Sequence, residues 1–153
     1  KNMPFQFTVR FYPMPELTLP EIDSFTIVDD GTDPKDMVSK RLLEQVSFEV
    51  PDELIRTELG PGFYEEIHKQ GTEWNAAADR VRLMLILKRI ARQEGIEVDD
   101  QDVEECIETR AVELGVNSHA LKAEFEKGSM KQRLKDMLLA ESTLNFLIEK
   151  SGR

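Results

Sequence analysis

The sequence is poor in cysteine and has no long apolar run, and each shortage excludes a class of protein. Its 153 residues include one cysteine, Cys106, so no internal disulfide can form, as is usual in a reducing compartment. The densest apolar run, LMLIL at residues 83–87, is far shorter than the roughly 20 residues of a transmembrane helix. No signal peptide is recognisable at the start. We therefore expect a cytoplasmic protein with no membrane partner.

Positive charge is also scarce. Lysine and arginine number 20 against 30 acidic residues, and the net charge is −10. The basic residues alternate with acids, as in RIARQEGIEVDDQDVEE at residues 89–105. A nucleic-acid binder needs clustered lysine and arginine to displace counterions. We expect no direct contact with nucleic acid.

Patterns typical of catalysis are missing as well. The histidines, His68 and His119, are far in sequence from each other and from Cys106, and no spacing suits a zinc site. Cys106, within EECIE, is predicted to be a buried residue on a helix face rather than a nucleophile. GPGF at residues 60–63 is not followed by the lysine and serine or threonine of a phosphate-binding loop. We expect no catalytic residue, no metal and no cofactor, and hence no enzyme.

The first 32 residues have an extended pattern. Apolar and polar residues alternate over residues 5–12, which is typical of a half-buried strand. Pro13, Pro15 and Pro20 lack the backbone donor, so this ribbon can pair along one edge at most. The residues expected to dock it on the rest of the protein are Phe5, Phe7, Val9 and Phe11.

From residue 33 onward the pattern is helical. Asp33 is a typical N-cap with Pro34 at the first helical position, and Pro51 is expected at the first position of the next helix. Thr72 is expected to cap the third helix and Gly95 to end it, and Gly128 is expected to end the fifth. The expected helices cover residues 33–47, 51–59, 72–95, 99–115, 117–128 and 129–150. The third is apolar nearly all round in its middle and should lie at the centre of the core. The last carries an apolar stripe at Leu134, Met137, Leu138, Leu144, Leu147 and Ile148.

The order of these segments resembles the bacterial trigger factor family. FTVRFYPMPELTLPEIDSFTI resembles its connector, and FEVPDELIRTEL resembles the start of its C-terminal chaperone domain. LILKRIARQEGIEVDDQDVEECIETRAVELG and MKQRLKDMLLAESTLNFLIEK resemble later parts of that domain. The similarity spans nearly the whole chain in the same order, and it rests on this concatenation rather than on one specific motif.

The resemblance implies a fold and a function. It implies a mainly α, elongated domain of several helices at residues 33–153, with two helical arms around an open cradle. An extended connector strand at residues 1–32 would pack on this body. The implied activity is ATP-independent binding of exposed hydrophobic segments of nascent or unfolded polypeptides, which aids folding and suppresses aggregation.

The chain also departs from the family pattern. Only VDDGTD, at residues 28–33, lies where the family has an FKBP-type prolyl isomerase domain. Either that domain was removed or this is a natural form without it, so isomerase activity is not expected. The chain starts in mid-strand, after the position of the family's ribosome-docking domain. Ribosome contact is therefore expected only through a missing N-terminal domain.

The candidate client-binding residues are apolar side chains on the two arms. On the first arm they are Leu54, Ile55, Leu59, Phe63, Tyr64, Ile67 and Trp74. On the second arm they are Val103, Ile107, Val112, Leu114, Leu121 and Phe125. An apolar residue at helical spacing is more often part of the core than of a binding surface, so each is open to both interpretations.

Other hypotheses remain open. The chain could be the core of a SurA-type periplasmic chaperone, or a helical scaffold or assembly module with one fixed partner. A prolyl isomerase would need a β-rich half that this sequence lacks. The acidic surface should favour basic or neutral clients, such as ribosomal proteins. The sequence leaves the oligomeric state open, including a weak dimer.

Overall fold

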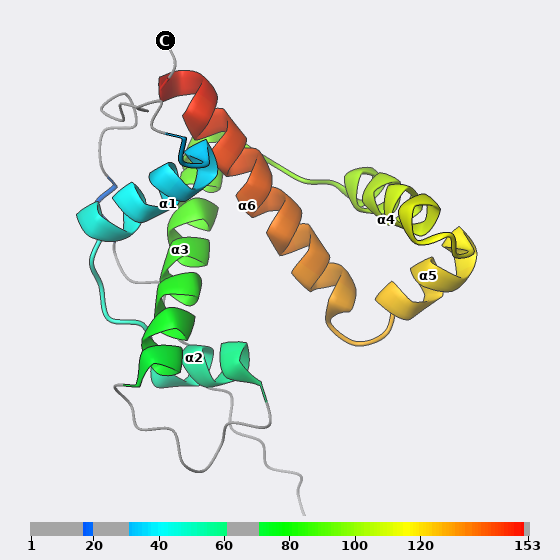
Figure 1. Cartoon of the computed structure of the whole chain (residues 1–153), viewed down its shortest axis with the longest axis horizontal. Helices are drawn as coiled ribbons and strands as arrows, with labels where there is room; N and C mark the ends of the chain where they lie inside the picture. The colour runs from blue at the N-terminus through cyan, green and yellow to red at the C-terminus, as the bar shows by residue number, and fades with distance from the viewer. Residues whose placement is uncertain (1–16, 20–30, 61–70, 152–153) are drawn as a thin grey trace, which may run out of the picture.

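A computed structural model describes residues 17–19, 31–60 and 71–151 of the chain (Figure 1). These residues form six α-helices and contain no strand, which confirms the mainly α prediction. Some predicted site residues lie outside the described part: the docking residues Phe5, Phe7, Val9 and Phe11, and the arm residues Phe63, Tyr64 and Ile67.

The helices follow the predicted order. They are α1 (Pro34–Gln45), α2 (Asp52–Leu59), α3 (Thr72–Glu94), α4 (Asp100–Leu114), α5 (Ser118–Phe125) and α6 (Met130–Ser151). None of them, within the described residues, is long and apolar enough to cross a bilayer.

Local chemistry accounts for most of the helix ends. The carboxylate of Asp33 accepts a hydrogen bond of 2.8 Å from the Lys35 backbone N–H, as an N-cap does. Asp99 and Asp102 form a reciprocal capping box at the start of α4, with both bonds at 2.9 Å. Helix α3 ends at Gly95 with φ of +69°, a left-handed conformation that costs glycine little.

Three predicted helix ends are wrong by a few residues. Thr72 is the first residue of α3, and its N-cap is Gly71, without a side-chain bond. Pro51 caps α2 instead of occupying its first turn. Helix α5 ends at Phe125, three residues before Gly128. Neither Gly71 nor Pro51 makes a side-chain cap hydrogen bond, and α5 ends on Glu126 in a right-handed conformation, so no residue-specific bond marks these ends in the sequence.

Helix α6 packs against every other described helix except α2. It packs along α3 and against α1 on one side and against α4 and α5 on the other. Helix α2 packs on the first turns of α3. Figure 1 shows α4 and α5 standing apart from α1, α2 and α3, with α6 running between the two groups. The described chain is therefore elongated.

The buried apolar residues form three separate clusters. The largest joins α1, α3 and α6 and includes Leu42, Ile86, Ile90 and Leu147. A second joins α2 to α3 around Ile55 and Trp74. The third joins α4, α5 and α6 around Val103, Ile107 and Leu134. Burial of α3 in the largest cluster agrees with its predicted central place.

The described piece of the connector touches the largest cluster. Leu17 and Leu19 are half-buried and pack against it. These two leucines come after the predicted docking residues, whose own packing stays a prediction.

Ion pairs that are at least partly open to solvent link α6 to its neighbours. Lys35 Nζ on α1 donates to Glu141 Oε1 at 2.7 Å, and Lys88 Nζ on α3 donates to Asp136 Oδ2 at 2.7 Å. Pairs in water contribute about 0–1 kcal/mol each. Burial of apolar side chains therefore dominates the stability of this arrangement.

The packing predicts the cost of removing a leucine. Leu147 is fully buried in the largest cluster, so Leu147→Ala should lower the free energy of unfolding by about 2–5 kcal/mol. Leu114→Ala makes the same chemical change at a position with 57% exposure and serves as the control. Urea denaturation monitored by circular dichroism measures both, and equal losses would contradict the packing described.

Candidate functional site

Two apolar concavities lie on either side of α6. One lies between α4, α5 and α6 and encloses about 720 Å³; we call it the α4–α6 hollow. The other lies between α2, α3 and α6 and encloses about 470 Å³; we call it the α3–α6 groove. Both are open to solvent; the hollow lies beside the cluster of α4, α5 and α6, and the groove lies beside the clusters that contain α2 and α3.

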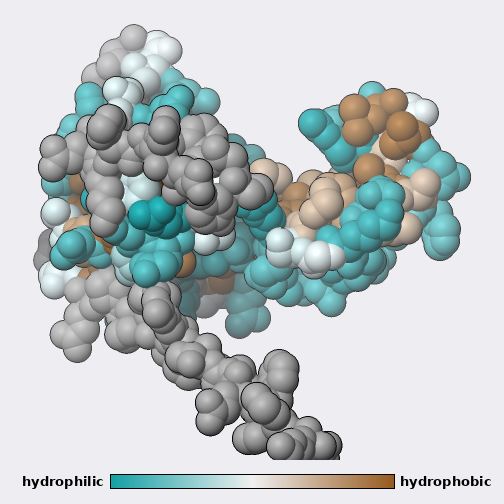
Figure 2. All heavy atoms as spheres, turned by 90° about the horizontal axis from the view of Figure 1, so that it is seen from below, coloured by the Kyte–Doolittle hydropathy of each residue, from teal (hydrophilic) through white to brown (hydrophobic). Residues whose placement is uncertain are grey.

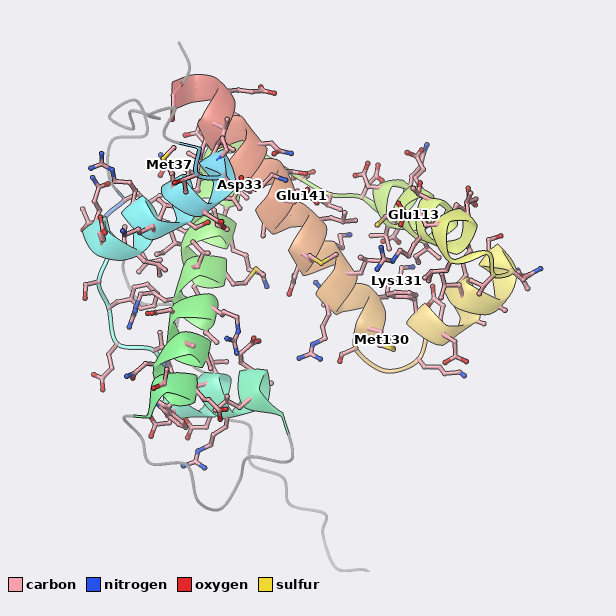
Figure 3. The ribbon with its side chains drawn as sticks, viewed as in Figure 1. Asp33, Met37, Glu113, Met130, Lys131 and Glu141 are labelled. Carbon is pink, nitrogen blue, oxygen red and sulfur yellow. The ribbon has the colours of Figure 1, made fainter. Side chains whose placement is uncertain are left out.

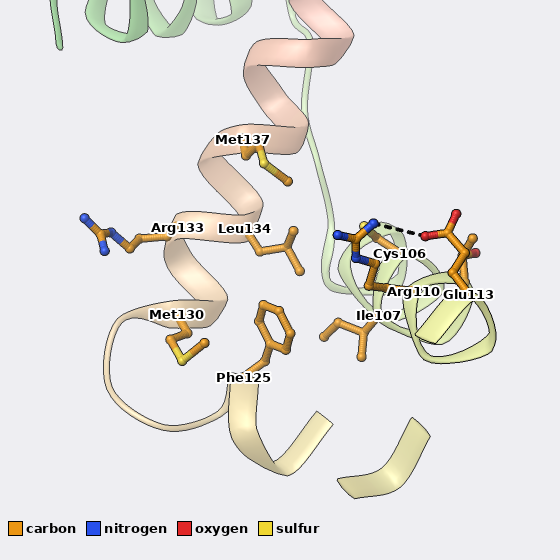
Figure 4. Close-up of a pocket in the computed structure, with 10 residues that line it drawn as sticks. Cys106, Ile107, Arg110, Glu113, Phe125, Met130, Arg133, Leu134 and Met137 are labelled. Atoms are coloured by element: carbon orange, nitrogen blue, oxygen red, sulfur yellow. Dashed lines mark hydrogen bonds and ion pairs between the residues drawn. The ribbon is translucent and has the colours of Figure 1, made fainter. Parts of the chain in front are cut away.

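The α4–α6 hollow has an apolar floor and a methionine edge. Ile107 of α4, Phe125 of α5 and Leu134 of α6 face one another across it (Figure 4). Met130 and Met137 of α6 are 46% and 52% exposed beside them. Methionine is flexible and polarisable, so it adapts to apolar partners of different shapes. The full lining is Cys106, Ile107, Thr109, Arg110, Glu113, Phe125, Met130, Arg133, Leu134 and Met137.

The polar rim on α4 is neutralised internally. Arg110 Nη1 donates to Glu113 Oε2 at 3.1 Å, drawn as the dashed line in Figure 4. Both residues belong to the same helix face, three positions apart. The apolar floor is therefore the larger part of what a ligand would meet on this side.

The α3–α6 groove is built in the same way. Leu83 and Met84 of α3, Leu54 of α2 and Leu144 of α6 supply apolar lining. Arg80 Nε donates to Glu58 Oε1 at 2.7 Å and neutralises its charge at the edge. The middle of α3 thus faces the core with one side and this groove with another.

Further apolar surface lies at the far end of α4. Val112 is 82% exposed, and Leu114 and Val116 follow it. Figure 2 shows hydrophobic atoms gathered at the end of the molecule that α4 and α5 form. Exposed apolar surface that is contiguous and rimmed by polar residues commonly marks a binding site.

Charged residues hold the walls of the hollow in place. Lys122 of α5 donates to Glu108 at 2.9 Å and to Glu104 at 3.2 Å on α4. Lys131 of α6, labelled in Figure 3, reaches Glu126 at 3.1 Å and Asp100 at 3.9 Å. The hydrogen bond from Lys122 to Glu108, with that to Glu104, raises the pKa of Lys122. The hydrogen bond to Glu126 likewise raises the pKa of Lys131.

The predicted client-binding residues fall into three groups by exposure. Those that are buried in the clusters are Ile55, Trp74, Val103 and Ile107. Those that are half-buried are Leu54, Leu59, Leu121 and Phe125, and those that are exposed are Val112 and Leu114. The structure brings Ile107 and Phe125 together in the α4–α6 hollow, and Leu54 lines the α3–α6 groove. Their binding role stays a prediction.

Met130 and Met137 are not among the client-binding residues predicted from the sequence. Met137 is predicted as part of the apolar stripe of the last helix, but more than half of this side chain is exposed. The available signal was the spacing of Met130 and Met137, seven residues and two turns apart on one face, with Leu134 between them. Cys106, predicted to be buried, is half-buried and lines the hollow. Within the described residues no group of three histidine, cysteine or acidic side chains could hold a metal ion.

The fold and these concavities define a class: an all-helical domain with apolar surface open between its helices. The family model described as "Bacterial trigger factor protein (TF) C-terminus" matches residues 32–149. The chain therefore belongs to this family, which is a family of chaperones. The match covers the C-terminal part and not the isomerase domain.

A curated relative agrees with the family match. The chain is 27% identical over 149 residues to a protein named trigger factor from Nitratidesulfovibrio vulgaris. The similarity covers 86% of this chain and 34% of the relative, so the chain spans about a third of that protein's length. The search of solved structures found no match.

The contacts of Lys122 predict a pH dependence. Its raised pKa means that the folded state holds this proton more tightly than the unfolded state does. The stabilisation is therefore fully present below the unfolded pKa, about 10.4, and is lost as the pH rises through the folded pKa. The difference in Tm between the wild type and Lys122→Gln should be constant up to about pH 10 and should shrink above it.

Thermal melts between neutral pH and about pH 11 measure this difference. The control is Lys40→Gln on α1, since Lys40 is exposed and makes no ion pair with another described residue. A difference that persists unchanged at the highest pH would contradict the assigned contacts.

Proposed function

We propose that this chain is an ATP-independent chaperone domain that binds exposed hydrophobic segments of nascent or unfolded polypeptides in the cytoplasm. The observation that carries the proposal is the α4–α6 hollow, whose apolar floor and half-exposed methionines lie open to solvent. Membership of a chaperone family supports it. Ribosome contact, if any, would come from parts of longer relatives that this chain does not span.

The shape of the apolar surface suits short segments without a fixed fold. It is spread over the hollow, the groove and the end of α4 instead of one enclosed pocket. A ligand could therefore engage it in several registers. Methionine at the edge tolerates side chains of different size, which suits many clients better than one fixed partner. This breadth favours a chaperone over a scaffold with a single partner.

Affinity should be modest and release should need no nucleotide. Apolar burial contributes about 25 cal/mol per Å², while ordering a disordered client costs about 2–5 kcal/mol. A net of about −8 kcal/mol corresponds to a micromolar Kd. The net charge of −10 would keep the empty surface from associating with itself.

The predicted client-binding residues would have two different roles, depending on whether they are exposed or buried. Val112 and Leu114, which are exposed, and Leu54 and Phe125, which line the concavities, would contact the client. The buried ones would act indirectly by fixing the helices that form the walls. We add Met130 and Met137 to the contact surface.

The proposal predicts the effect of a charge in the hollow. Met137→Glu places a charged carboxylate beside Leu134 and Phe125, which a bound apolar segment would have to desolvate. This variant should lose most of the chain's suppression of aggregation of a denatured protein, measured by light scattering without nucleotide. Because Met137 is half-exposed, its Tm should change little.

The matched control is Ser142→Glu. Ser142 is exposed on the same helix and lines neither concavity, so the same charge there should leave suppression intact. The proposal fails if the wild type does not suppress aggregation at several-fold excess. It also fails if the two variants behave alike.

A further inference from the structure

Arg133 of α6 carries an uncompensated charge shared by both concavities. It lines the α4–α6 hollow and the α3–α6 groove, and it is exposed. The other arginines of the two linings, Arg110 and Arg80, are paired with Glu113 and Glu58. Within the described part of the chain, the Arg133 side chain has no ion pair or hydrogen bond. Among the arginines that line the two concavities, Arg133 is thus the one without an acidic partner among the described residues.

The nearest acid on the same helix is already engaged. Asp136 lies three residues further along α6. Its Oδ2 accepts a hydrogen bond of 2.7 Å from Lys88 Nζ, and its Oδ1 accepts one of 3.0 Å from Gln132 Nε2. Glu141, further along the same helix, accepts a hydrogen bond from Lys35 Nζ. These contacts leave the guanidinium of Arg133 with its donors available.

The Arg133 side chain points away from α4 and α5 (Figure 4). Figure 4 shows Arg133 leaving α6 on the side opposite to Leu134 and running away from α4. Its stem therefore borders the hollow, while its charged end is directed away from it. Since Arg133 also lines the α3–α6 groove, it stands between the two apolar surfaces.

We propose that Arg133 is a specificity-determining residue that binds an aspartate or glutamate within an apolar client segment. This inference rests on the proposed function. The segment crosses α6 with apolar side chains in both concavities and its carboxylate on the guanidinium. Arginine binds carboxylate through two parallel hydrogen bonds, which are stronger than neutral ones. The acid is internal to the segment, because a chain end at Arg133 would leave one concavity empty.

The net charge of the protein does not exclude such a client. Repulsion from a charge of −10 acts over the Debye length, about 8 Å at physiological ionic strength, and is screened beyond it. A direct contact with the guanidinium acts within hydrogen-bond distance and loses less to screening, particularly beside apolar surface. The preference for basic clients expected from composition therefore affects how readily a client approaches the protein. Arg133 instead acts on the segment once it is bound.

The test uses three fluorescent peptides of about ten residues, capped at both ends and identical except for a central glutamate, glutamine or lysine between apolar flanks. Fluorescence anisotropy at physiological ionic strength gives each Kd. The wild type should bind the glutamate peptide about three- to tenfold more tightly than the glutamine peptide. Arg133→Gln should abolish this preference, Arg133→Glu should reverse it toward lysine, and Arg133→Lys should restore part of it.

Controls separate this inference from the proposed function. Arg89→Gln removes an exposed arginine of α3 that lines neither concavity, and it should leave the preference unchanged. Equal binding of the glutamate and glutamine peptides by the wild type overturns the role of Arg133 while the chaperone proposal stands. A fourth peptide has the central glutamine and an uncapped C-terminus, and if it binds more tightly than the glutamate peptide, the role of Arg133 is likewise overturned. If no peptide binds and aggregation is not suppressed, the proposed function itself fails.

Discussion

The packing of α6 against helices on two sides is the constraint on which the rest of the structure depends. Its second half contributes Leu147 to the cluster with α1 and α3, and its first half contributes Leu134 to the cluster with α4 and α5. An α-helix is only about 10–12 Å across with its side chains. One helix that serves two clusters in this way leaves part of its surface uncovered where they diverge. Met130, Arg133 and Met137 occupy that part, so the concavities follow from the packing itself.

Division of the apolar residues among three small clusters has a further consequence. A single core would draw most apolar side chains inward, but here the α4–α5 pair is joined to the rest mainly through α6. Exposed lysine–carboxylate pairs, such as Lys122 with Glu108, help to orient α5 on α4 but contribute little to the free energy of unfolding. The arrangement leaves apolar surface exposed between helices, which is the feature on which the proposed function rests.

Much of the helical framework could be predicted from local sequence, while exposure could not. Asp33, Asp99, Gly95 and Gly115 end or begin helices because their side chains or backbone conformations satisfy the helix termini. Leu134 and Met137 belong to one apolar stripe, yet the first is 8% exposed and the second 52%. Periodicity shows that two residues share a helix face, but the neighbouring helix covers only part of that face.

The sequence by itself determined the order and approximate extent of the described helices, the acidic composition and the family resemblance, because each depends on residues close together in the chain or on their order. Only the tertiary structure decided which apolar residues are buried, which line the concavities and which lie exposed on the surface. It also brought Ile107, Phe125 and Leu134 from three helices to one hollow. It left Arg133 unpaired among the described residues, since Lys88, distant in sequence, bonds to Asp136. Such outcomes depend on contacts between distant segments, which no local pattern specifies.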